Sequence, residues 1–69
     1  MENFKIKDEY IELIALLKAV GIAETGGQGK RMVDSGEVLR NGAPETRKRA
    51  KLIPGDLIEI NGFKISVTK

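Results

Sequence analysis

A run of positive charge is the part of this sequence best suited to hold another molecule. The stretch Thr46–Lys51 (TRKRAK) places four cations within five consecutive positions of a 69-residue chain. The planar guanidinium of arginine can make two parallel hydrogen bonds to a phosphate, and lysine adds a mobile point charge. A solvated turn whose charges only keep a protein in solution would have the same composition. The chemistry of this stretch therefore allows either a phosphate-binding loop or an exposed turn.

The distribution of charge along the chain favours the phosphate-binding loop. The chain has 12 Lys and Arg against 10 Asp and Glu, a net charge of only +2. Between Lys30 and Lys51, however, there are seven cations and three anions, so this part carries +4 and the remainder carries −2. Such asymmetry is typical of a protein that presents one face to an anionic partner.

A second candidate for phosphate contact lies just before Lys30 and Arg31. The segment TGGQ at 25–28 has the capping-box form of a helix start. The free amides and positive dipole end of such a helix favour an anion, and two glycines would let the backbone approach it. The alternative is a plain capped helix with two exposed cations. The residues predicted to bind are Lys30, Arg31, Arg40, Arg47, Lys48, Arg49 and Lys51, with close backbone approach at Thr25, Gly26, Gly27 and Gln28.

Other chemistries find little support in the sequence. The absence of cysteine and histidine excludes thiolate chemistry, effectively excludes zinc and removes the commonest general base. A nucleotide-binding P-loop at Gly29-Lys30 would need a glycine where Glu24 stands and Ser or Thr where Arg31 stands. The carboxylates are expected to serve local structure, with Asp56 bonding backbone amides in a turn. We expect no enzymatic activity, no metal and no small-molecule cofactor.

Hydrophobic periodicity predicts two helices in the first half of the chain. Apolar residues recur at spacings of three and four, so the first helix is expected over 9–20. Asp8 would cap its start, Gly21 would end it, and Tyr10 would lie in the core. The second helix is expected over 25–35.

Alternation and turn signals predict strands in the rest of the chain. Short strands are expected at 3–7 and 37–40. The segments 57–60 and 63–67 flank Asn61-Gly62, a strong tight-turn signal, and read as a hairpin. Two helices with several short strands indicate an α+β fold.

This order of elements resembles the S4 RNA-binding domain, in which two packed helices precede a small, strongly bent sheet. The matching features are an apolar first helix ending at Gly21, a polar cap at Thr25, and a basic second helix followed by GEVLRNG at 36–42. The turn and strand PGDLIEI at 54–60 come next.

The sequence is still more similar to small stand-alone bacterial S4-like proteins of the YbcJ type. In these the second helix opens with small residues, like GGQGK at 26–30, and the basic loop resembles ETRKRAKL at 45–52. S4 domains attached to larger proteins often carry Ser-Arg at the start of the second helix. Here that position reads Thr25-Gly26, so the contact of that arginine is not carried over.

The resemblance implies a single S4-like (alpha-L) domain over 1–69, with two packed N-terminal helices followed by a small bent antiparallel sheet. It also implies that the second helix and the 47–51 loop border one surface that grips structured RNA, with ribosomal and transfer RNA among the candidates. Because the chain has only three aromatic residues, recognition is expected to be of shape rather than of stacked bases.

The competing hypothesis is a small protein–protein interaction module with a basic surface loop. An exposed sheet edge could recruit a partner strand, and the loop could meet an acidic protein. We expect a monomer. The longest apolar run is far shorter than a membrane span and the N-terminal residues are charged, so no membrane association and a cytoplasmic location are expected.

Overall fold

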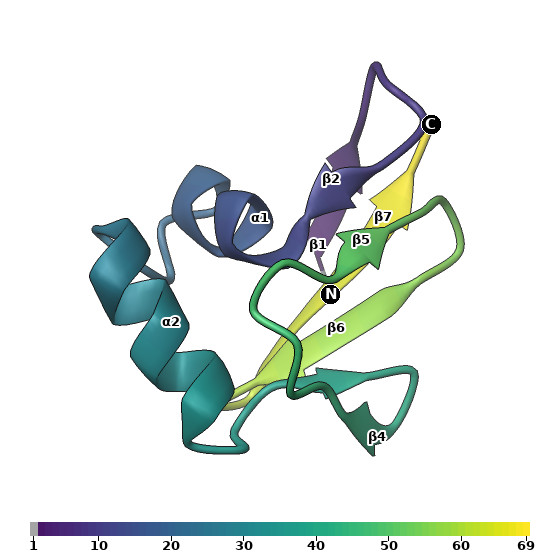
Figure 1. Ribbon diagram of the computed structural model, residues 1–69. Helices are drawn as coiled ribbons and strands as arrows, with labels where there is room; N and C mark the ends of the chain where they lie inside the picture. The colour runs from purple at the N-terminus through teal and green to yellow at the C-terminus, as the bar shows by residue number, and fades with distance from the viewer. Residues whose placement is uncertain (1) are drawn as a thin grey trace.

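The computed structural model describes residues 2–69, in which two short helices lie beside two β-sheets (Figure 1). In chain order the elements are β1 (Glu2–Lys5), β2 (Ile11–Glu12), α1 (Leu13–Ala19), α2 (Gly26–Asp34), β3 (Leu39–Arg40), β4 (Ala43–Pro44), β5 (Lys51–Leu52), β6 (Leu57–Ile60) and β7 (Phe63–Thr68). The loop between β4 and β5, which holds the basic run, passes between α2 and the small sheet (Figure 1).

The main sheet has five strands in the order β1-β7-β6-β3-β4. The predicted hairpin of β6 and β7 is confirmed, with Ile60 paired to Phe63 and with left-handed φ values of 48° at Asn61 and 83° at Gly62. The expectation of an antiparallel sheet is wrong in one respect, because β1 pairs with β7 in parallel. The strand that precedes the helices thus covers an edge of β7 that would otherwise be open to pairing.

The first helix begins later than its hydrophobic periodicity predicts. It starts at Leu13 rather than at position 9, and its N-cap is Glu12 rather than Asp8. Ile11 instead pairs with Leu52 in the two-stranded sheet of β2 and β5, and the Leu13 amide donates to the carbonyl of Ala50 at 2.9 Å. Backbone pairing with a distant segment has therefore replaced the first turn of the predicted helix.

Tyr10 lies outside the core as a result of this change. We expected it on the buried face of the first helix, but its side chain is 41% exposed. The core that forms without it is entirely aliphatic. Its fully buried side chains are Leu13, Leu16, Leu17, Val33, Val38, Leu52, Ile58, Ile60, Ile65 and Val67. Neither helix in residues 2–69 is long and apolar enough to cross a membrane.

The second helix begins and ends as the sequence predicts. The hydroxyl of Thr25 accepts from the Gln28 amide at 3.1 Å, and the Gln28 side chain accepts from the Glu24 amide at 2.8 Å. Ser35 is the C-cap, and Gly36 follows with a left-handed φ of 80°. These two side-chain bonds secure a helix start that contains two glycines.

Gly29 is the glycine of this helix that packing explains. A Cβ at this position would lie 3.1 Å from Cγ2 of Ile14 on α1, so the two helices touch where Gly29 has no side chain. A Cβ at Gly27 would find only the Thr25 hydroxyl, at 3.9 Å, and one at Gly26 would have nothing within 4 Å. Close helix packing therefore requires only one of the three glycines.

Alanine substitution should separate these roles. Gly27→Ala should raise the free energy of unfolding by about 0.5–1 kcal/mol, because alanine favours the helix and the site has room. Gly29→Ala should gain clearly less than that or destabilise the protein, because Ile14 must move. Urea denaturation of both variants measures the difference. An equal gain at both positions would contradict the close helix contact.

Candidate functional site

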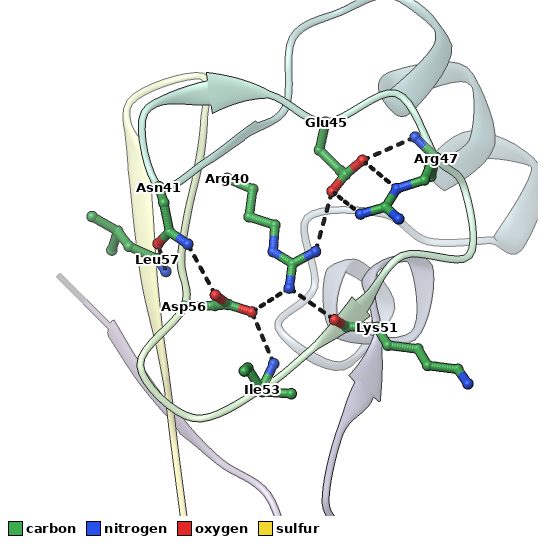
Figure 2. A network of polar contacts seen from close by, with 8 residues as sticks. All are labelled: Arg40, Asn41, Glu45, Arg47, Lys51, Ile53, Asp56 and Leu57. Carbon is green, nitrogen blue, oxygen red and sulfur yellow. Dashed lines mark hydrogen bonds and ion pairs between the residues drawn. The ribbon is translucent and has the colours of Figure 1, made fainter.

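Arg40 joins three segments of the chain through its guanidinium group (Figure 2). Its Nη2 donates to Oδ2 of Asp56 at 2.7 Å and to the carbonyl of Lys51 at 2.9 Å. Its Nη1 donates to Oε1 of Glu45 at 3.3 Å. The Arg40 side chain is only 20% exposed, and both carboxylates are 9% exposed. Arg40 is thus committed to internal bonds, and its contact with RNA stays a prediction.

Asp56 connects the turn after β5 to the turn after β3. Its Oδ2 also accepts from the Ile53 amide, and its Oδ1 accepts from the Asn41 side chain, each at 2.9 Å. Asn41, which has a left-handed φ of 53°, accepts in turn from the Leu57 amide at 2.8 Å. The predicted role of Asp56 as a turn residue is confirmed, and it extends to side chains that the sequence did not connect to it.

Glu45, which accepts from Arg40 through Oε1, also accepts hydrogen bonds from Arg47 through Oε2. Its Oε2 accepts from the backbone amide of Arg47 at 3.1 Å and from its Nε at 3.3 Å. The Arg47 side chain is nevertheless 73% exposed, so one edge of its guanidinium is held while the rest faces solvent. Glu45 therefore orients a surface arginine at the first position of the basic run.

The ionisation of this network is fixed by its hydrogen bonds. The Arg47 side chain, the strongest influence, lowers the pKa of Glu45, and this outweighs burial. Burial by itself would raise the pKa of Asp56, but bonds from Ile53, Asn41 and Arg40 lower it overall. The bond to Asp56 raises the pKa of Arg40. Glu45 and Asp56 are therefore ionised at neutral pH, and their two negative charges balance the positive charges of Arg40 and Arg47.

Two other cations of the basic run form ion pairs with acids of neighbouring elements. Lys48 Nζ lies 3.3 Å from Oδ2 of Asp34 at the end of α2, and Arg49 Nη2 lies 3.3 Å from Oε2 of Glu12. The Arg49 side chain is 85% exposed. Exposed ion pairs of this kind contribute roughly 0–1 kcal/mol, so a phosphate could displace the carboxylates at small cost.

Two adjoining surface hollows bring the separated cations together. One is lined by Arg40, Arg47, Arg49, Ala50 and Lys51, and the other by Glu12, Ile14, Ala15, Lys18, Gly26, Lys30 and Arg49. Arg49 lines both, so the loop and α2 border one continuous surface. We call the exposed cations of the two hollows, Lys18, Lys30, Arg47, Arg49 and Lys51, the basic surface.

The predicted site residues divide into those that line these hollows and those that do not. Arg31 is exposed but lines neither hollow, and Lys48 also lines neither and is paired with Asp34. At the start of α2, Gly26 lines the second hollow, whereas the Gln28 amide is already bonded to the Thr25 hydroxyl. Of the four residues at 25–28 that were predicted to approach a phosphate, Gly26 alone lines one of these two hollows.

Lys18 is a member of the basic surface that the sequence did not reveal. It lies in the last turn of α1, a helix of otherwise apolar residues, and joins Lys30 only because the two helices pack closely. The packing of the helices, rather than any motif, places it there. Among residues 2–69, no three His, Cys, Asp or Glu side chains are grouped so that they could hold a metal ion.

The family of this chain follows from comparison with known proteins. The family model described as "S4 domain" matches residues 4–68. The chain belongs to the S4 domain family. The predicted resemblance is thereby confirmed, and the basic surface lies within the matched part of this S4 domain.

Two relatives cover most of the S4 domain. The chain is 39% identical over 68 residues to the Escherichia coli (strain K12) protein named "Putative RNA-binding protein YbcJ", with 97% of each chain covered. It is 40% identical over 58 residues to the Bacillus subtilis (strain 168) protein named "Probable ribosome maturation protein RlbA", covering 84% of this chain and 82% of that one.

A solved structure has the same fold. The solution structure of YbcJ from E. coli, described as revealing an "alfaL motif involved in RNA-binding", aligns with a TM-score of 0.76 and 37% sequence identity. The alignment covers 100% of this chain and 89% of that chain. The S4-like fold is therefore confirmed, with the mixed five-stranded sheet described above.

Removing the central arginine should destabilise the S4 domain in a pH-dependent way. Arg40→Met leaves two nearly buried carboxylates without their shared donor, so it should lower the free energy of unfolding at pH 7 by about 2–3 kcal/mol. In the wild type, Glu45 and Asp56 have folded-state pKa values below their unfolded ones. Their stabilisation is complete above the unfolded values and is lost as pH falls through the folded ones. The penalty of Arg40→Met should therefore shrink on acidification.

Chemical denaturation of wild type and variant from pH 7 down to pH 2 measures this penalty, because the folded-state pKa values of both carboxyls lie below their ordinary values. Arg31→Met is the matched control, because Arg31 is exposed and makes no ion pair within the described part of the chain. A penalty for Arg40→Met that matched the control, or that did not change with pH, would contradict the structural role of this network.

Proposed function

We propose that this S4 domain binds structured RNA through the basic surface. The observation that carries the proposal is that Arg49 lines both hollows, which makes the cations of α2 and of the loop one surface. The names of the two relatives and the description of the YbcJ structure support RNA as the partner.

The charge balance at the site supports an anionic partner. The two hollows and the network beneath them contain six cations, Lys18, Lys30, Arg40, Arg47, Arg49 and Lys51, and three carboxylates, Glu12, Glu45 and Asp56, a net charge of +3. Glu45 and Asp56 are buried and bonded to arginine, so Glu12 is the acid that a phosphate would meet at the rim. An exposed +3 field on a chain of net charge +2 attracts a polyanion to this face.

The network of Arg40 would give this surface its shape before RNA arrives. Glu45 fixes one edge of Arg47, and the bond from Arg40 to the Lys51 carbonyl holds the end of the loop. A ligand then need not restrain the loop backbone, which lowers the entropic cost of binding. The free edges of Arg47 and Arg49 can make paired hydrogen bonds to phosphate oxygens.

Recognition would be of backbone shape in a double-stranded or folded element. The major groove of A-form RNA is too deep and narrow for side chains to read, so phosphates and sugars are what this surface can reach. The protein measures only 28 × 22 × 19 Å, so it covers a short segment. About four to six phosphate contacts would give a log–log salt dependence with a slope on the order of −3 to −5.

Ribosomal RNA is the structured RNA to test first, because the B. subtilis relative is named for ribosome maturation. Transfer RNA is the natural comparison. This partner would also place the protein in the cytoplasm, where ribosomes are assembled in bacteria. The proposed action is binding, with no chemical step assigned to the domain.

Loss of two cations that meet at one hollow should weaken RNA binding. Lys30→Ala combined with Arg49→Ala should reduce the salt slope by about 2 and lower affinity for structured RNA at low salt, because each cation neutralises about one phosphate. Filter retention of a ribosomal RNA hairpin, titrated with KCl, measures both quantities.

The matched control removes the same charge elsewhere. Lys64→Ala combined with Lys69→Ala takes two exposed lysines from outside the basic surface and should leave the slope nearly unchanged. Equal losses in the two double variants would mean that net charge alone governs binding. Tighter, salt-sensitive binding to polyglutamate than to RNA would instead support the protein-interaction module.

A further inference from the structure

The outer face of the β2–β5 sheet carries exposed apolar side chains beside the basic surface. Side chains alternate between the two faces of a strand. Ile11 and its partner Leu52 face the core, and Leu52 is fully buried. Tyr10 precedes Ile11 and Ile53 follows Leu52, so alternation directs both away from the core, and they are 41% and 51% exposed.

Lys51 links Tyr10 to the basic surface. Its ammonium group lies 4.9 Å from the centroid of the Tyr10 ring, and Lys51 is also one of the residues that line the hollow containing Arg47 and Arg49. Figure 2 shows this side chain extending away from the Arg40 network while its carbonyl oxygen faces Arg40. Lys51 therefore lies between the exposed Tyr10 ring and the arginines proposed to bind phosphate.

A separate hollow lies on the N-terminal side of Tyr10. It is lined by Phe4, Lys5, Ile6, Lys7, Asp8, Tyr10 and Ile11. Its lining combines apolar side chains with two lysines and one aspartate. An apolar protein side chain would gain nothing from the two lysines, whereas a nucleotide has both a flat apolar face and a phosphate.

We propose that Tyr10 stacks on one unpaired nucleobase of the bound RNA, whose phosphate lies against Lys51. The proposal rests on the function proposed above and adds a preference to it. Phosphate contacts along the basic surface would hold a duplex, and Tyr10 would select a duplex that has an unpaired nucleotide next to it. Every base has a π-face, so one exposed ring can supply this contact without reading sequence.

With only three aromatic residues in the chain, RNA recognition was expected to involve shape and no stacked bases, whereas an exposed Tyr10 allows one base to stack. An extended platform that stacks several bases is still absent from the described residues, because Phe4 is half-buried and Phe63 borders a different hollow. A single exposed tyrosine is enough for one base. Helical periodicity predicted Tyr10 in the core, so this exposed position could not be expected from the sequence.

The fluorescence of the protein can report the contact directly. Tyr10 is the only tyrosine and the chain has no tryptophan, so intrinsic emission comes from this ring. We would titrate the protein with an RNA hairpin that contains a single-nucleotide bulge, and with the same hairpin without the bulge. The bulged hairpin should quench the emission and bind more tightly, and the fully paired one should bind with little quenching.

Substitution separates stacking from other effects. Tyr10→Leu should lower affinity for the bulged hairpin by roughly five- to a hundredfold and leave affinity for the paired hairpin unchanged. Tyr10→Phe should retain the preference. Phe63→Leu, which removes another exposed aromatic that lines neither hollow of the basic surface, should change neither affinity.

The remaining outcomes each overturn the proposal. Equal affinity of wild type and Tyr10→Leu for the bulged hairpin would exclude stacking while leaving duplex binding intact. An equal loss on both hairpins would assign Tyr10 a structural role. If wild type bound neither hairpin at low salt, the RNA-binding function itself would fail. Quenching by an acidic polypeptide rather than RNA would assign the ring to a protein partner.

Discussion

Arg40 connects parts of the chain that backbone pairing alone does not hold together. Strands β3, β4 and β5 are each two residues long, and the loop that carries the basic run has no ladder of its own. The guanidinium of Arg40 bonds to Glu45 at the start of this loop, to the Lys51 carbonyl at its end and to Asp56 in the following turn. A strand pair this short has little stability by itself. The shape of the loop therefore comes from a few charged side chains that are nearly buried.

The same network divides the arginines and lysines into two groups with different uses. The positive charges of Arg40 and Arg47 are balanced by the negative charges of Glu45 and Asp56, although the outer edge of the Arg47 guanidinium faces solvent. The two hollows are also lined by four cations outside this neutral network, which are Lys18, Lys30, Arg49 and Lys51. Of these, Arg49 forms an exposed ion pair with Glu12. A hydrogen-bonded network of zero net charge next to a group of exposed cations suits a ligand that is anionic and itself rigid, such as folded RNA. Counting charges along the sequence could not make this distinction, because it treats all seven cations of the region alike.

Local signals in the sequence predicted what local forces determine. The Asn61-Gly62 hairpin and the Thr25 cap each involve residues within a few positions of one another, and both are confirmed. The errors arose where distant segments compete with local preference. Ile11 has helical periodicity with its neighbours but pairs with Leu52, which moves the start of α1 and exposes Tyr10.

The parallel pairing of β1 with β7 and the burial of Arg40 have the same origin in long-range contacts. A strand is recognisable from its alternation, but its partner is not, and an arginine next to a turn signal looks exposed until the acids that surround it are known. The resemblance to S4 domains supplied the overall order of elements. It did not indicate Lys18 or Tyr10, whose positions next to Lys30 and Lys51 depend on packing between distant segments.

Mapping of amide chemical shifts during titration of the ¹⁵N-labelled protein with a structured RNA is the most direct test of the claim that two separated segments form one RNA-binding surface. The largest shifts are expected at positions 47–51, together with Lys18 and Lys30 on the two helices. Shifts confined to the loop, with α1 and α2 unchanged, would contradict a shared surface. Shifts centred on the turn between β6 and β7 would place the RNA elsewhere on the molecule.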